Sequence, residues 1–193
     1  MTKTTIALLR HGQTDWNIDF RLQGTSDIPL NETGLAQARA AAEAISGPWD
    51  VIVSSPLDRA VKTAQIVAER QGLGDLQIDA LLLERSFGEA EGMLYTEWRE
   101  KFSDSKVPGG ESIEELEARC HRLLEHLATK YRGQRVLTVS HGALIRKLLN
   151  IVSNGELPRE GERLGNASMS LIVHNESGWE IEKYAPETLK PAE

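Results

Sequence analysis

The sequence predicts an α/β fold: a three-layer α/β/α sandwich, with a mostly parallel sheet, helices on both faces and a small, partly helical cap. Short apolar runs alternate with longer stretches of helical periodicity, which is the pattern of an α/β layered fold. Several of the short runs are apolar throughout, as strands covered on both faces should be. The chain has 193 residues, a length that fits one domain. We expect residues 1–193 to form that domain, with the cap at about 85–110.

Six runs are predicted to be strands. In chain order they are Thr5–Leu9, Val51–Ser54, Ile78–Leu83, Val136–Ser140, Met169–His174 and a last strand near Trp179–Tyr184.

The first two predicted helices have recognisable starts. Asn31 is a preferred N-cap residue and precedes a helix over about residues 32–45. Ser55 is expected to cap the second helix, with Pro56 at the first helical position, where a missing N–H costs nothing. We expect this second helix to end at about Gln71.

Two further helices follow in the second half of the chain. Ser112–Glu115 has the pattern of a capping box, and it opens a helix whose apolar side chains fall on one face up to Tyr131. Cys120 lies on that apolar face, so we expect an unreactive thiol. A last helix is predicted to follow Gly142. Residues 85–110 are less regular, mix aromatic with charged side chains, and are interpreted as the cap.

Composition argues against several classes of partner and location. Lys and Arg total 22 and Asp and Glu total 29, and the net charge of −7 argues against nucleic acid or an anionic membrane as a partner. No apolar run is long enough for a membrane span, and the N-terminal one is too short for a signal peptide. Cys120 is the one cysteine in the sequence, which excludes an internal disulfide. We therefore expect a cytoplasmic protein.

The predicted strand ends carry side chains suited to binding an anion. In a parallel layered sheet, ligands bind beyond the carboxyl ends of the strands. Four strands are followed there by cationic or titratable groups, directly or within a turn: Arg10 and His11, Arg59, Glu84, and His141. The sequence therefore predicts that these groups gather at one edge of the sheet.

Each of these residues alone has an ordinary structural explanation. An arginine after a strand is usually solvated, and a lone histidine is more often a hydrogen-bonded structural residue than a catalyst. The joint pattern is more specific, because two His-Gly pairs each directly follow an apolar strand. Gly12 and Gly142 remove a side chain at a place where a ligand or another backbone must come close.

The motifs resemble one known family. The run Leu9-Arg10-His11-Gly12-Gln13-Thr14, with Asn17 three residues later, resembles the signature of the histidine phosphatase superfamily, in its phosphoglycerate-mutase-like branch. The resemblance covers nearly the whole chain. Further blocks match in order and spacing: Gln23-Gly24 with Pro29-Leu30 and Gly34; Ser54-Ser55-Pro56 with Arg59-Ala60 and Thr63-Ala64; Glu84 with Phe87-Gly88 and Glu91-Gly92; Gly110-Glu111-Ser112; and Val139-Ser140-His141-Gly142.

The resemblance implies phosphoryl transfer through a phosphohistidine intermediate. We expect a phosphomonoester hydrolase that acts on a small phosphorylated metabolite. The resemblance implies that His11 is the nucleophile and Glu84 the proton donor. It also implies a phosphate site formed by Arg10, Arg59 and His141, with Asn17 and Gln23 assisting.

Physical chemistry is consistent with these roles. Guanidinium groups form paired hydrogen bonds with phosphoryl oxygens, and imidazole is a nucleophile only when it is neutral. The helix start at Gly142 is expected to add backbone N–H groups near the anion. Arg85 is a candidate for binding a second anionic group of the substrate. The sequence has no cluster at metal-ligand spacing, so we expect no metal and no cofactor.

Three functions stay open at this point. The family's mutases carry Glu-Arg-x-Tyr-Gly and, after the next Gly, a Lys, whereas this chain has Phe87 and Tyr95 at those two positions. The segment between Glu84 and His141 is also short and has no Arg-Arg pair. Water is therefore the favoured acceptor and a phosphatase the favoured function. The alternatives are a phosphoglycerate-mutase-type phosphotransferase and a catalytically silent phosphate-binding module. The sequence does not indicate an oligomeric state.

Overall fold

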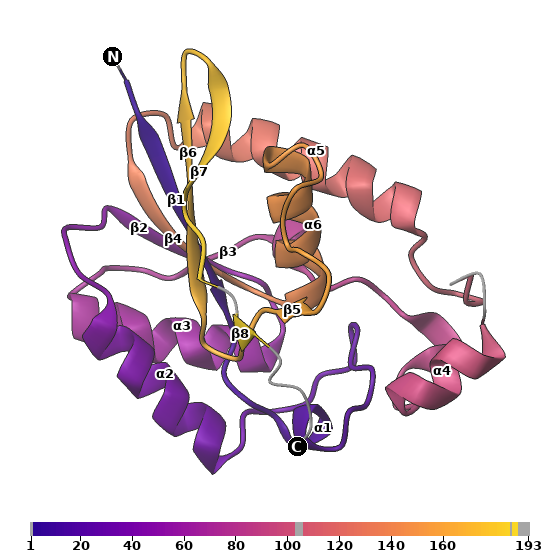
Figure 1. Cartoon of the computed structure of the whole chain (residues 1–193). Coiled ribbons are helices and arrows are strands. Elements are labelled where there is room, and N and C mark those ends of the chain that lie inside the picture. Colours follow the sequence, from indigo (N-terminus) through magenta and orange to yellow (C-terminus); the bar gives the residue numbers. More distant parts are fainter. Residues whose placement is uncertain (1, 103–105, 186, 189–193) are drawn as a thin grey trace.

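A computed structural model describes residues 2–102, 106–185 and 187–188, and a six-stranded sheet forms its centre (Figure 1). The strand order is β3-β2-β4-β1-β6-β7. The strands β1, β2, β3 and β4 pair in parallel, whereas β6 is antiparallel to both β1 and β7. The bounds are β1 (Thr4–Arg10), β2 (Val51–Ser54), β3 (Gln77–Ile78), β4 (Arg135–Ser140), β6 (Met169–Asn175) and β7 (Gly178–Lys183); β5 (Glu162–Arg163) and β8 (Glu187–Thr188) form a separate pair.

Helices cover both faces of the sheet, which confirms the predicted three layers (Figure 1). The helices α2 (Glu32–Ala44) and α3 (Asp58–Gln71) lie on one face, and α5 (Ile113–Lys130) and α6 (Gly142–Val152) on the other. Successive β1 side chains point to opposite faces. Ile6 and Leu8 therefore pack into the apolar cluster with α5 and α6, and Ala7 and Leu9 into the cluster with α2 and α3.

Two predicted helix caps are confirmed. The Asn31 side chain accepts a hydrogen bond of 2.8 Å from the Gly34 N–H at the start of α2. At α5, the Ser112 side chain accepts from the Glu115 N–H, and the Glu115 carboxylate accepts from the Ser112 N–H. These bonds satisfy N–H groups that the first turn of a helix cannot pair internally.

The predicted strand over Ile78–Leu83 is wrong beyond its first residue. The strand β3 ends at Ile78, and a 3₁₀ turn, η1 (Ala80–Leu82), follows. The Asp79 side chain accepts a hydrogen bond of 2.9 Å from the Leu81 N–H. This local bond competes with strand pairing, which an apolar run alone does not reveal.

The predicted start of the second helix is also wrong. The helix α3 begins at Asp58, and its N-cap residue is Leu57, whose side chain cannot accept a hydrogen bond. The Asp58 N–H instead donates to Oδ1 of Asp27, a residue far away in the sequence (2.8 Å). Ser55 therefore does not cap this helix, and its side chain contacts His141.

The cap segment is partly helical, as predicted. It contains a 3₁₀ turn, η2 (Gly88–Ala90), and the helix α4 (Tyr95–Lys101); residues 103–105 lie outside the described part of the chain. Phe87 and Trp98 form a small apolar cluster with Leu22, and this cluster packs against Ala143 in the first turn of α6. The cap is thereby attached next to the carboxyl end of β4. Over residues 2–102, 106–185 and 187–188, no helix is long and apolar enough to cross a lipid bilayer.

Candidate functional site

Three neighbouring strand ends bring His11, Ser55 and His141 together. The strand β4 lies between β1 and β2, and all three run in the same direction. Hydrogen bonding continues one residue beyond β1 and β2, because the His11 N–H donates to Ser140 O and the Ser55 N–H donates to Val139 O, both at 3.0 Å. The two imidazole rings consequently lie 5.2 Å apart between centroids.

The His11 ring has a defined tautomer. Its Nδ1 lies 2.6 Å from the carbonyl oxygen of Gly12, which can only accept, so Nδ1 carries the proton and Nε2 keeps a lone pair. The side chain is almost fully buried. Burial, and then the positive charges of Arg10 and Arg59, hold the pKa of His11 well below its usual value. The ring is therefore neutral at physiological pH.

The second imidazole is fully buried. Nε2 of His141 lies 2.7 Å from the Ser55 hydroxyl, whereas Nδ1 has no hydrogen-bond partner among the described residues. Burial lowers the pKa of His141 well below its usual value, with contributions from His11, Arg59 and Arg10. His11, Arg10 and Arg59 therefore lie close enough to His141 for their charges to affect it, at the edge of the sheet where the sequence predicts that these groups gather.

Arg59 is a buried cation in the first turn of α3. Its guanidinium donates to two backbone carbonyls, from Nη1 to Ser26 O and from Nη2 to Gly24 O, both at 2.7 Å. No ion pair joins it to a carboxylate of the described residues. Burial lowers its pKa, and the nearby carboxylate of Glu84 partly offsets this effect. Its charge is therefore stabilised by backbone dipoles and not by an ion pair.

Glu91 holds the loop that supplies these carbonyls, a role that the sequence did not predict. Its carboxylate accepts from the backbone N–H groups of Thr25 (3.0 Å) and Ser26 (2.9 Å), and also from the Phe87 N–H of the cap (3.1 Å). A Cβ on Gly24 would lie 2.1 Å from the Glu91 carboxylate. Glu91 lies in a block that resembles the family pattern, but its contacts are with a distant loop, so local sequence could not assign this function.

Arg10 is the last residue of β1. Its Nη1 donates to the carbonyl oxygen of Leu164. The guanidinium lies beside Gly142, where a Cβ would come within 3.3 Å of Arg10 Nε. Gly142 thus leaves room for the arginine at the start of α6. At Gly12, by contrast, a Cβ would lie 2.4 Å from Gly34 O, so the group that comes close there is the backbone of α2.

Glu84 follows the 3₁₀ turn η1 and lies at the start of α6. Its Oε2 accepts from the Ala143 N–H (3.0 Å), and its Oε1 accepts from the N–H groups of Leu144 (3.1 Å) and Arg85 (2.8 Å). The sequence predicts that the first N–H groups of this helix face a bound anion. That expectation is wrong for Ala143 and Leu144, because both groups are used by Glu84.

Asn17 and Gln23 belong to a hydrogen-bond network that reaches the backbone of His11. Asn17 belongs to α1 (Asp15–Ile18), and its side-chain oxygen accepts from the Thr14 N–H (3.0 Å). Gln23 is nearly buried and accepts from the Thr14 hydroxyl (2.9 Å). The Asn166 amide donates both to Asn17 and to the His11 carbonyl oxygen, at 3.2 Å each.

Arg85 is largely buried against the cap. Its Nε donates to the Glu111 carbonyl oxygen (2.9 Å), and its guanidinium lies 5.1 Å from the centre of the Phe87 ring. Burial lowers its pKa, and the charge of Glu111 opposes that effect. The predicted candidate for a second anion-binding group is therefore engaged by the protein itself.

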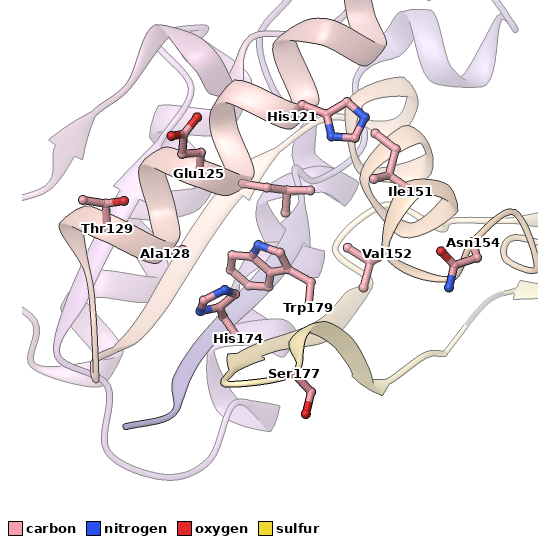
Figure 2. A pocket seen from close by; sticks show the side chains of 11 residues that line it. His121, Glu125, Ala128, Thr129, Ile151, Val152, Asn154, His174, Ser177 and Trp179 are labelled. Atoms are coloured by element: carbon pink, nitrogen blue, oxygen red, sulfur yellow. The ribbon is translucent and has the colours of Figure 1, made fainter. Parts of the chain in front are cut away.

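A cavity of about 530 Å³ lies elsewhere, between α5, α6 and the β6–β7 hairpin (Figure 2). Its lining includes Trp179, His174, His121 and Glu125, and none of the predicted site residues. Across the part of the chain that the structure describes, no group of three or more His, Cys, Asp or Glu residues could hold a metal ion.

Known proteins match this chain along most of its length. Residues 6–186 match the histidine phosphatase superfamily, branch 1. The uncharacterized phosphatase PhoE of Bacillus subtilis is 41% identical over 182 residues, which is 94% of each chain. The probable phosphoglycerate mutase GpmB of Salmonella choleraesuis is 36% identical over 203 residues, covering 95% of this chain and 91% of its own.

A solved structure supports the same assignment. A mycobacterial glucosyl-3-phosphoglycerate phosphatase superimposes with a TM-score of 0.82 at 29% identity, covering 94% of this chain and 98% of its own. The observed fold, the two adjacent imidazoles and these matches agree with the resemblance seen in the motifs. The chain belongs to the histidine phosphatase superfamily, branch 1.

Proposed function

We propose that the protein is a phosphomonoesterase that transfers a phosphoryl group first to His11 and then to water. The observation that carries this proposal is the state of the His11 ring. Its Nδ1–H is used by the Gly12 carbonyl, its Nε2 keeps a lone pair, and its pKa is lowered by burial and two arginines. A neutral imidazole among cations is what attack on a phosphate dianion requires.

In the first step, Nε2 of His11 attacks the phosphorus and the bond from phosphorus to the ester oxygen breaks. Arg10, Arg59 and His141 bind the phosphoryl oxygens, over which negative charge spreads in the transition state. Glu84 gives its proton to the departing ester oxygen. Because Oε1 of Glu84 already accepts two N–H bonds and Oε2 only one, we assign the transferred proton to Oε2.

In the second step, water attacks the phosphorus of phosphohistidine while the Glu84 carboxylate takes a proton from that water. The bond between phosphorus and nitrogen breaks, the electron pair returns to Nε2, and orthophosphate leaves. The hydrogen bond from Nδ1 to the Gly12 carbonyl keeps the ring in the same orientation through both steps. No step uses a metal ion.

Water is the proposed acceptor rather than a sugar acid. Tyr95 occupies the position where the family's mutases carry a lysine, and its ring packs on Trp98 with centroids 5.2 Å apart. Arg85 is engaged by Glu111 and Phe87. Both observations leave few cations for a substrate carboxylate. One observation supports the alternative, a mutase: the similarity to a probable phosphoglycerate mutase.

The proposed substrate class is a small phosphorylated metabolite, such as a sugar phosphate or a phosphorylated acid, in the cytoplasm. The name of the similar mycobacterial enzyme, a glucosyl-3-phosphoglycerate phosphatase, is consistent with this class.

The test is hydrolysis of p-nitrophenyl phosphate and of a panel of phosphorylated metabolites by the wild type and His11→Ala. We expect phosphate release by the wild type, unaffected by EDTA, and a loss of at least about 1,000-fold in kcat for the variant. His121→Ala, which changes an exposed histidine of α5, is the matched control and should keep full activity. Equal rates for wild type and His11→Ala would overturn the proposal. Transfer of labelled phosphate between two positions of a substrate, without release, would identify a mutase.

A further inference from the structure

Arg119, on the inner side of α5, uses all five of its N–H groups. Its Nε and Nη2 donate to the two carboxylate oxygens of Glu111, each at 2.7 Å, and the two side chains are 12% and 17% exposed. Its Nη1 donates to the carbonyl oxygens of Leu81 (2.9 Å) and Leu83 (2.7 Å), and Nη2 also reaches Glu84 O (3.4 Å). The planar, charged guanidinium group has five N–H donors and can make all of these hydrogen bonds, whereas the ammonium group of a lysine has three and cannot.

These bonds fix the backbone that carries Glu84. The fourth carbonyl of the run, Leu82 O, accepts from the Ser140 hydroxyl at the end of β4 (2.7 Å). Four consecutive carbonyls therefore accept from side chains instead of from a neighbouring strand. The turn from η1 into Glu84 is consequently held by α5 and β4, and its position does not depend on sheet pairing.

Glu111 extends the same attachment to the other end of the cap. Its N–H donates to Ser86 O (2.9 Å), and its carbonyl accepts from Arg85 Nε (2.9 Å). The segment after Glu84 is thus bound to the segment that leads into α5. Arg119 and Glu111 together clamp the residues on both sides of Glu84.

We propose that Arg119, paired with Glu111, is a positioning residue that sets Glu84 in place to protonate the leaving oxygen. This inference rests on the proposed function, in which Glu84 is the proton donor. Neither side chain touches the substrate or the reacting atoms in this proposal. The pair acts through the backbone of residues 81–84, and its partly buried ion pair is favourable because every donor and both carboxylate oxygens are satisfied.

The chemistry gives this role a specific signature. When the bond from phosphorus to the ester oxygen breaks, its electron pair goes to that oxygen, which then takes the proton of Glu84. An alkoxide leaves poorly without a proton, whereas p-nitrophenolate leaves well without one. A displaced Glu84 therefore slows hydrolysis of an alkyl phosphate far more than hydrolysis of p-nitrophenyl phosphate.

The experiment compares kcat/KM for glycerol 2-phosphate and p-nitrophenyl phosphate in the wild type, Arg119→Lys and Glu84→Gln. Arg119→Lys keeps the charge but cannot bridge Glu111 and three carbonyls at once. We expect kcat/KM of this variant to fall by about 10-fold or more for glycerol 2-phosphate and by less than about 3-fold for p-nitrophenyl phosphate. The larger loss is a part of what a general acid contributes to the rate. Arg122→Lys, at an exposed position of the same helix, should change neither value.

The outcomes separate the two proposals. If Glu84→Gln changes the ratio of the two substrates and Arg119→Lys does not, the positioning role is wrong and the proposed function stands. If Glu84→Gln leaves the ratio unchanged, Glu84 is not the donor and both assignments fall. An equal loss on both substrates in Arg119→Lys also overturns the positioning role. If Arg119→Lys does not fold, as judged by circular dichroism, Glu111→Gln replaces it and should shift the ratio in the same direction.

Discussion

His11 and His141 are the two histidines that the fold buries, and their burial selects the neutral form of both rings. The neighbouring guanidinium groups add to this effect because a positive charge disfavours a second one nearby. In the proposed mechanism, the cations that bind the phosphoryl group thereby also keep the nucleophile unprotonated. Cys120 follows the same logic: burial raises the pKa of its thiol to about 12, which agrees with the expected lack of reactivity.

The depressed pKa of His11 predicts the acid side of the pH profile. A nucleophile with the usual value of 6.5 would be half protonated at that pH, whereas His11 stays neutral well below it. We expect kcat/KM for an aryl phosphate not to fall between pH 7.5 and pH 6, once the titration of the substrate itself has been subtracted. Steady-state rates in buffers of constant ionic strength would measure this. A loss of half the activity near pH 6.5 would contradict the assignment.

At the scale of elements, two glycines set how α2 meets the loop that follows β1. A Cβ on Gly34 would lie 2.1 Å from the backbone oxygen of Gln13, and one on Gly12 would lie 2.4 Å from the backbone oxygen of Gly34. Both contacts involve backbone, which cannot rotate away as a side chain can. The carbonyl that holds the His11 ring belongs to this closely packed loop.

Gly34→Ala should therefore destabilise the protein. Alanine favours a helix interior over glycine by about 1 kcal/mol, but the overpacking against backbone costs more. We expect the free energy of unfolding to fall by about 1–3 kcal/mol in urea titrations monitored by circular dichroism. Gly74→Ala is the control, since a Cβ there meets nothing within 4 Å, and it should change stability by less than about 0.5 kcal/mol. A Gly34→Ala protein as stable as the wild type would show that α2 shifts freely.

A change at Glu91 should alter the proposed phosphate site through the loop from Gly24 to Ser26. Glu91→Gln replaces one carboxylate oxygen by an amide that cannot accept from the loop N–H groups, so the carbonyls that hold Arg59 should lose their position. We expect the inhibition constant of inorganic phosphate to rise by about 3- to 10-fold, a fraction of what a hydrogen bond to a charged group contributes. Glu97→Gln, in the exposed part of α4, is the control. An unchanged constant for Glu91→Gln would show that Arg59 keeps its position without Glu91.

The strands and helices that could be predicted are those whose signals are local. Asn31 and Ser112 cap their helices with their own side chains, and the alternation in β1 follows from burial on both faces. The error at Ile78–Leu83 has a local cause, the Asp79 side chain, together with a distant one, Arg119 of α5. The error at the start of α3 has a distant cause, Asp27 in a loop. The positions of His11 and His141 directly after parallel strands predicted that the two rings lie close together. Their hydrogen-bond partners, Gly12 O and the Ser55 hydroxyl, could not be predicted from the spacing of the motifs. The catalytic roles themselves stay predictions.

At the scale of the whole molecule, the two buried histidines make stability depend on pH. Both have folded-state pKa values below the unfolded value of 6.5, so the unfolded chain binds protons that the folded chain does not as pH falls below 6.5. Stability is therefore full above pH 6.5 and decreases below it. Each histidine contributes a slope of about 1.4 kcal/mol per pH unit in this window.

Urea unfolding at pH 7, 6 and 5.5 would measure this decrease. We expect the wild type to lose stability with a limiting slope of about 2.7 kcal/mol per pH unit below pH 6.5, before the carboxylates titrate. A His11→Gln, His141→Gln double variant should lose most of that slope while keeping the contribution of other groups. Equal slopes for the two proteins would place the pH dependence elsewhere in the chain.

The position of β1 between β4 and β6 has a consequence for biosynthesis. This strand is translated before both of the strands that flank it, Arg135–Ser140 and Met169–Asn175. The backbone groups on its two edges are paired only after both strands have been synthesised, so the centre of the sheet is completed only after Met169–Asn175 has left the ribosome. A nascent chain halted before Met169 would expose one open edge of β1, a surface on which chaperones act and on which unfinished chains aggregate.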